Sequence, residues 1–115
     1  MNPRGMHILL DVYGVDPDIL DDLDLIRQYL LEAAEQADAT VVDEVFYKFD
    51  PVGLTGILVL GESHLSIHTY PEENYASIDC YTCGNTNPVK AAEYLLKVLA
   101  PEDYELHEII RAQKY

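Results

Sequence analysis

The 115-residue sequence has little positive charge, little cysteine and no long apolar run. It contains 7 lysine and arginine residues against 21 aspartate and glutamate residues, a formal net charge of −14. The positive residues are scattered, so no basic patch could follow a phosphate backbone, and we expect no nucleic acid partner. We interpret the acidity as a solubility feature, with attraction of cationic ligands as the alternative.

Two cysteines are too few to staple a small secreted domain with disulfides. The longest apolar run, residues 56–61, is far shorter than the roughly 20 residues that a membrane-spanning helix needs. The first residues lead directly into a strand-like segment, without the apolar stretch of a signal peptide. We therefore expect a cytoplasmic protein that does not associate with membranes.

Hydrophobic periodicity predicts one domain with the element order β-α-β-β-β-β-α-β. Asp16-Pro17 and Asn87-Pro88 each place a capping side chain before a proline, which is typical of a helix start. Strands are predicted at residues 7–13, 39–49, 54–60, 65–70, 75–83 and 104–111. This order favours an α+β two-layer sandwich: a mainly antiparallel sheet with two helices on one face.

The two faces of the predicted sheet differ in chemistry. Along 75–83, residues 76, 78 and 80 form a small apolar set, and the alternate positions carry hydroxyl, carboxylate and thiol groups. Strand 54–60 is apolar on both faces, which indicates that both are covered. With two helices in the chain, we expect another subunit to supply the second cover, so that the protein dimerises through its sheet.

A motif at residues 61–84 carries the functional signal, with the sequence GESHLSIHTYPEENYASIDCYTCG. This segment resembles the cleavage and catalytic region of the S-adenosylmethionine decarboxylase family, in its short prokaryotic form. Chain length and element order agree, so the resemblance covers essentially the whole chain. The matching pieces are Glu62-Ser63-His64, His68-Thr69, Pro71-Glu72, Asp79 and Thr82-Cys83-Gly84.

The resemblance implies that the chain cuts itself between Glu62 and Ser63, into fragments 1–62 and 63–115. The Ser63 hydroxyl would attack the Glu62 carbonyl and convert the peptide bond to an ester. β-Elimination and hydrolysis would then leave a pyruvoyl group at residue 63. This group would form a Schiff base with the substrate amine and accept the electrons released as CO₂ departs.

The resemblance also assigns the proton-transfer residues. His68 would be the base that drives elimination at residue 63, a role that suits imidazole near neutral pH. Five extended residues span about 16 Å, so His68 should not reach Ser63 on its own strand. A homodimer with active sites at its interface would bring His68 of one subunit to Ser63 of the other. Cys83 would return a proton to the substrate carbon.

Four further residues match positions that bind substrate or assist cleavage in the family. Thr55 stands where the family commonly has a serine that assists processing. Phe49 and Tyr70 match aromatic residues that sandwich the adenine, and Glu72 matches the acceptor of the ribose hydroxyls. From the residues alone, core packing of Phe49 and solvation of a turn by Glu72 remain alternatives. We expect no metal ligands.

The leading functional hypothesis is decarboxylation of S-adenosylmethionine, which supplies the aminopropyl donor for spermidine synthesis. Decarboxylation of arginine to agmatine is an alternative on the same scaffold, because the motif encodes the pyruvoyl group rather than the substrate pocket. A third hypothesis is a dimeric partner that does not cut itself and only binds ligand or regulates a catalytic relative. A metal or redox protein built on Cys80 and Cys83 is a fourth, although residues three apart on a strand face opposite sides.

Overall fold

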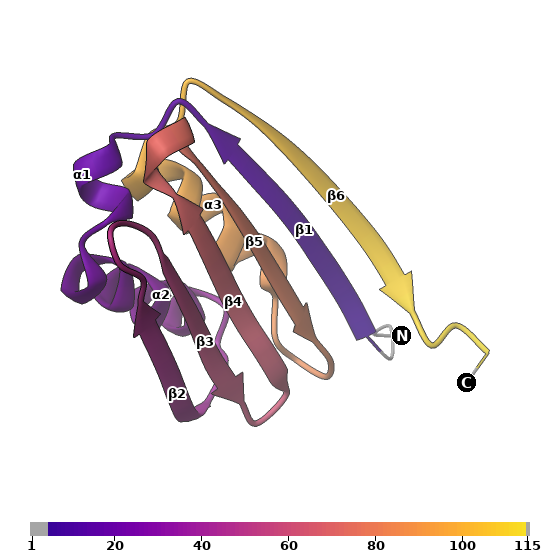
Figure 1. Cartoon of the computed structure of the whole chain (residues 1–115). Helices are drawn as coiled ribbons and strands as arrows, with labels where there is room; N and C mark the ends of the chain where they lie inside the picture. Colours follow the sequence, from indigo (N-terminus) through magenta and orange to yellow (C-terminus); the bar gives the residue numbers. More distant parts are fainter. Residues whose placement is uncertain (1–4, 115) are drawn as a thin grey trace.

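One face of a six-stranded sheet is covered by helices in the computed structural model, which describes residues 5–114 (Figure 1). The strand order is β2-β3-β4-β5-β1-β6, and every neighbouring pair is antiparallel. The strands are β1 Gly5–Tyr13, β2 Val41–Lys48, β3 Leu54–Leu60, β4 Ser63–Tyr70, β5 Tyr75–Thr82 and β6 Asp103–Arg111. The helices are α1 Pro17–Leu20, α2 Leu23–Gln36, α3 Pro88–Leu99 and the 3₁₀ helix η1 Pro71–Glu73. The predicted two-layer α+β architecture is confirmed.

The first predicted helix is interrupted, because two aspartates divide it into α1 and α2. The Asp22 carboxylate accepts a 3.1 Å hydrogen bond from the Leu25 amide and so caps α2. The Asp21 carboxylate turns away and binds the Lys48 ammonium at 2.7 Å and the Gly53 amide at 2.8 Å. Short acidic side chains favour caps and loops over helix interiors, so the break follows from their chemistry.

The core lies between the helices and the inner face of the sheet. In β4, Leu65 and Ile67 alternate with polar residues and are fully buried under the helices. Helix α2 contributes Ile26 and Leu30 to this layer. Helix α3 contributes a row of buried apolar residues to the same layer: Ala91, Ala92, Leu95 and Leu99.

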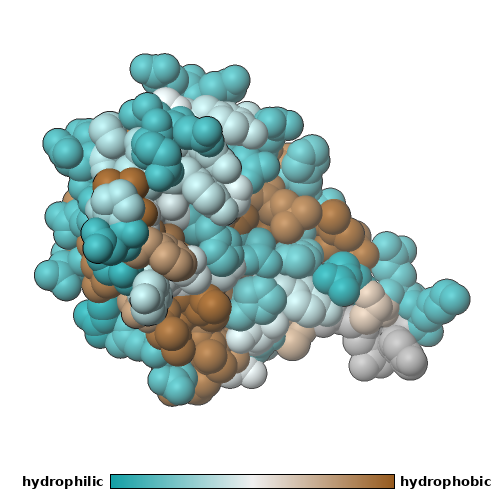
Figure 2. Space-filling model, viewed as in Figure 1, coloured by the Kyte–Doolittle hydropathy of each residue, from teal (hydrophilic) through white to brown (hydrophobic). Residues whose placement is uncertain are grey.

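The outer face of the sheet is open in the single chain. Apolar side chains lie there over the flanking strands, and polar side chains lie over the central ones (Figure 2). The cover expected for the second face of β3 does not come from residues 5–114, since Val59 is 40% exposed. The large exposed hydrophobic residues on this face are Leu9, Tyr13, Val45, Tyr47, Val59, Tyr70 and Ile109.

Within residues 5–114, no helix is long and apolar enough to cross a bilayer. The absence of a signal peptide stays a prediction, because the N-terminal segment begins with residues 1–4, which lie outside the described part of the chain.

Replacement of Leu65 by alanine should lower the free energy of unfolding by about 2–5 kcal/mol, because it leaves a cavity under the helices. Urea denaturation at a fixed protein concentration measures this change. The control is Ile110→Ala, which removes a side chain that is 49% exposed and should cost about 0.5 kcal/mol or less. Equal losses in the two variants would contradict the assignment of Leu65 to the core.

Candidate active site

The predicted cleavage point lies in a tight turn between β3 and β4. Gly61 and Glu62 form this two-residue turn, because Leu60 pairs directly with Ser63. The Gly61 amide donates to the Thr40 carbonyl at 2.8 Å, and the Thr40 amide donates to Glu62 Oε1 at 3.0 Å. The turn is thus held from both sides by the residue that precedes β2.

The backbone beside the Glu62–Ser63 peptide bond is strained, and the carbonyl of that peptide bond accepts a hydrogen bond. Ser63 has a φ of 155°, a backbone conformation that favours glycine and costs a serine on the order of 1–3 kcal/mol. The Cys83 thiol donates to the Glu62 carbonyl oxygen across 3.5 Å. This carbonyl therefore lies beside a donor that can stabilise negative charge on its oxygen.

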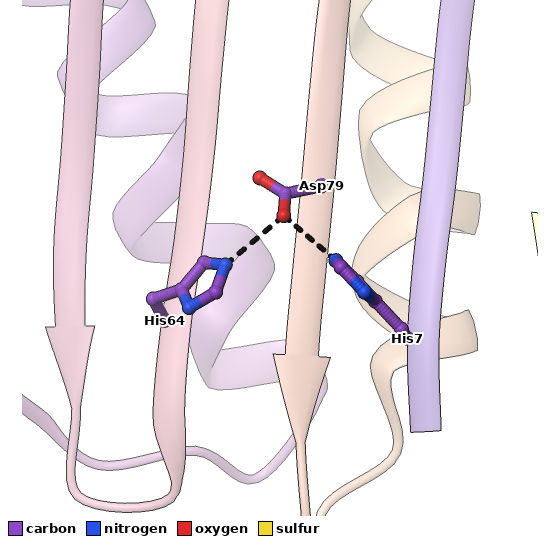
Figure 3. Close-up of side chains that lie close together, drawn as sticks. All are labelled: His7, His64 and Asp79. Atoms are coloured by element: carbon purple, nitrogen blue, oxygen red, sulfur yellow. Dashed lines mark hydrogen bonds and ion pairs between the residues drawn. The ribbon is translucent and has the colours of Figure 1, made fainter. Parts of the chain in front are cut away.

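A chain of hydrogen-bonded polar side chains begins at Ser63, and Figure 3 shows its continuation, in which His64 and His7 both point at Asp79. Ser63 Oγ lies 3.3 Å from His64 Nδ1, and His64 Nε2 lies 3.0 Å from Asp79 Oδ2. His7 Nε2, from β1, lies 2.8 Å from the same carboxylate oxygen, and the Ser66 hydroxyl donates to Asp79 Oδ1. The motif predicts no separate role for His64, although alternation along β4 is enough to place it on the polar face.

The Asp79 carboxylate holds this chain together. Burial raises the pKa of Asp79, but the hydrogen bonds from Ser66, His64 and His7 outweigh burial and bring the pKa below its usual range. The side chain is 26% exposed, so its partners replace much of its water. Asp79 is therefore a carboxylate at neutral pH and acts only as an acceptor.

The substrate-binding residues predicted from the motif converge at the other end of β4. Phe49, Thr55, His68, Tyr70 and Glu72 all line one hollow of about 320 Å³, which we call the Phe49 hollow. Within it, Thr55 Oγ1 lies 3.1 Å from His68 Nδ1, so the two residues assigned to processing are hydrogen-bonded to each other.

Ring contacts define the aromatic walls of the Phe49 hollow. The Tyr70 ring stacks on Tyr75 with 4.5 Å between centroids, and Phe49 packs against Tyr47 at 4.9 Å. Phe49 and Tyr70 remain 47% and 40% exposed, so core packing does not account for either ring. Both side chains keep surface for contact with a ligand.

The structure does not bring His68 to Ser63 within one chain. Ser63 pairs with Leu60 at the start of β4, whereas His68 pairs with Thr55 near its end. The site is therefore split between the Phe49 hollow and a second group that we call the cleavage cluster. The cleavage cluster consists of Glu62, Ser63, His64, Asp79 and Cys83.

Cys80 and Cys83 lie in different environments and are both free thiols. Cys80 points into the core and is 3% exposed, whereas Cys83 follows β5 and is exposed. Burial, together with the charge of Asp79, raises the pKa of Cys80 to about 12. The pair does not converge on one point, which argues against a shared metal ion or a redox disulfide.

Comparison with known proteins shows the family to which this chain belongs. The sequence model described as S-adenosylmethionine decarboxylase matches residues 6–112. The chain belongs to this family. Its relatives include "S-adenosylmethionine decarboxylase proenzyme 2" of Bacillus anthracis, which is 45% identical over 108 residues, covering 93% of this chain and 88% of that protein. The proenzyme of Symbiobacterium thermophilum is 53% identical over 96 residues, covering 83% and 73%.

A solved structure of the family has the same fold. The adenosylmethionine decarboxylase of Aquifex aeolicus superposes with a TM-score of 0.88 at 38% sequence identity, covering 96% of this chain and 92% of that one. The fold, the motif and the family therefore agree along nearly the whole chain.

We expect the native protein to react with iodoacetamide at Cys83 and not at Cys80. The thiolate is the reacting species, and burial with a raised pKa keeps Cys80 protonated at about pH 8. Peptide mass analysis after brief labelling locates the adduct, and labelling in denaturant supplies the positive control for Cys80. The Cys83→Ser variant should take up no reagent while folded; modification of native Cys80 would contradict the assigned burial.

Proposed function

We propose that this chain is a self-processing, pyruvoyl-dependent decarboxylase that acts on S-adenosylmethionine. The single observation that supports this most directly is the environment of the bond between Glu62 and Ser63. This bond lies in a fixed turn, has a strained φ at Ser63, and accepts a hydrogen bond from Cys83 at its carbonyl. Membership of a family whose relatives are called proenzymes supports the same proposal.

The residues present fit a pyruvoyl group at position 63. Cleavage after Glu62 relieves the strained φ and makes residue 63 the first residue of the second fragment, beside the Cys83 thiol. A pyruvoyl group supplies an electron sink, since its ketone can bind the substrate amine and draw electrons from the bond to the leaving carboxylate. The exposed Cys83 thiol is placed to donate a proton to the substrate carbon that loses the carboxylate.

The Phe49 hollow suits the nucleoside part of the substrate. Phe49 and Tyr70 offer aromatic surfaces for an adenine ring, and stacking on such surfaces is favourable for flat bases. Glu72 adds a carboxylate that can accept hydrogen bonds from both ribose hydroxyls. Arginine has no ring to fill this hollow, so its lining favours S-adenosylmethionine.

A complete active site needs a second copy of the chain. The Phe49 hollow and the cleavage cluster lie at opposite ends of β4, and both open on the uncovered face of the sheet. Two-fold packing of these faces would bring the hollow and His68 of one protomer to Ser63 of its partner. It would also bury the apolar side chains that the single chain exposes over β1, β3 and β6.

The purified protein should consist of fragments 1–62 and 63–115 and release CO₂ from S-adenosylmethionine, but not from arginine. Intact mass and release of labelled CO₂ measure these two properties. The Ser63→Ala variant should remain one chain of 13.0 kDa and release none. Release of CO₂ from arginine and not from S-adenosylmethionine would show that arginine is the substrate. An uncut wild-type chain would refute the pyruvoyl mechanism.

Complementation tests the shared active site. In a mixed dimer, the Ser63→Ala chain keeps His68 and the His68→Ala chain keeps Ser63. If each site takes residues from both protomers, His68 of the first chain should complete the cleavage site of the second. Co-expression with two different affinity tags, followed by intact mass of the doubly purified dimer, should show that the His68→Ala chain is cut. The same chain expressed alone is the control and should stay uncut. A verified mixed dimer with no cleavage would argue against the shared site.

A further inference from the structure

We propose that His64 is the general base that starts self-cleavage, and that Asp79 positions it. This inference rests on the proposed function, because it assigns a residue to the first step of that processing. His64 is adjacent to the cleavage bond, and its ring contacts the hydroxyl that must lose a proton. His68, on the far end of the strand, has no such contact within the chain.

Hydrogen bonding fixes the tautomer that a base requires. The Asp79 carboxylate can only accept, so His64 Nε2 carries the hydrogen that points at Oδ2 across 3.0 Å. The lone pair of the neutral ring is then on Nδ1, which faces Ser63 Oγ at 3.3 Å. Ser63, His64 and Asp79 are therefore arranged as a nucleophile, a base and an acceptor that orients the base.

The step assigned to His64 is the conversion of the peptide bond to an ester. Ser63 Oγ gives its proton to His64 Nδ1 and bonds to the Glu62 carbonyl carbon, whose oxygen takes up the negative charge beside the Cys83 thiol. The carbonyl re-forms as the bond to the Ser63 nitrogen breaks, and His64 returns the proton to that nitrogen. The products are an ester at Oγ and a free amine, with no redox change and no co-reactant.

The far end of the polar chain favours proton transfer over metal binding. His7 Nε2, His64 Nε2 and Asp79 Oδ2 lie close enough to share an ion, all within 4.8 Å of one another. However, the Arg111 guanidinium lies 3.1 Å from His7 Nδ1 and can only donate, so that nitrogen is the acceptor and His7 Nε2 keeps its hydrogen. If His7 Nε2 bound a metal, the ring hydrogen would be on Nδ1 and would need an acceptor. The group that faces Nδ1 is the guanidinium, which is only a donor.

Self-cleavage then uses one histidine for formation of the ester and another for its elimination. His64 would act on the Ser63 hydroxyl before the ester exists, and His68 of the partner would act on the ester in the elimination. The two roles predict different products when each residue is removed. Without His64 the chain should remain an amide, and without His68 it should stop as an ester.

Hydroxylamine separates these outcomes, since it cleaves esters under conditions in which amides survive. Full-length wild-type, His64→Ala and His68→Ala chains are made by pulse-labelled cell-free synthesis, and cleavage with and without neutral hydroxylamine is followed by mass. We expect His64→Ala to be processed about 10²–10⁴-fold more slowly and to resist hydroxylamine. The His68→Ala chain should split after Glu62 when the reagent is added. Glu35→Ala, which removes an exposed side chain of α2 on the helix side of the sheet, away from the proposed dimer face, is the control and should behave as wild type.

A double-mutant comparison separates a positioning role of Asp79 from a structural one. Asp79→Asn should slow processing by about tenfold or more in the wild-type chain and have little further effect in His64→Ala, because it acts through His64. Effects that multiply would overturn the positioning role. Processing of His64→Ala at the wild-type rate, or its splitting by hydroxylamine, would overturn the role of His64. An uncut wild-type chain would instead refute the proposed function, so the two failures are distinguishable.

Discussion

The register of the hairpin formed by β3 and β4 is the constraint on which the rest of the site depends. The pairing of Leu60 with Ser63 leaves two residues for the turn and fixes which side chains of β4 face the core. Because side chains alternate, a slip by one residue would send Leu65 and Ile67 into solvent and bury the histidines. The contacts between Thr40 and the turn hold this register, so one local arrangement positions both the bond proposed to be cut and the proposed binding surface.

Much of this structure could be predicted because it depends on local pattern. Alternation along β4 and β5 separates apolar from polar side chains, and the same rule placed Cys80 in the core. The motif predicts the residues that line the Phe49 hollow. They converge because β3 and β4 are adjacent strands and a turn follows β4. Sequence spacing sufficed to show that His68 and Ser63 of one chain lie apart.

The polar chain through Asp79 could not be predicted, because it depends on contacts between residues distant in sequence. His7 reaches Asp79 because β1 enters the sheet beside β5, and residues 72 positions apart become neighbours. The break between α1 and α2 was missed for a different reason. Apolar spacing continues across it, and the capping by Asp22 and the ion pair of Asp21 with Lys48 override the periodicity.

The strand order determines what the proposed cut after Glu62 would do to the molecule. Strands β1, β2 and β3 precede the cut and β4, β5 and β6 follow it, yet β1 lies between β5 and β6, and β3 lies beside β4. The two pieces are interleaved, so neither can leave without breaking backbone ladders along both edges of β1 and one edge of β4. If the proposed cut occurs, the fold should survive the loss of that covalent bond, because the sheet itself would join the two fragments.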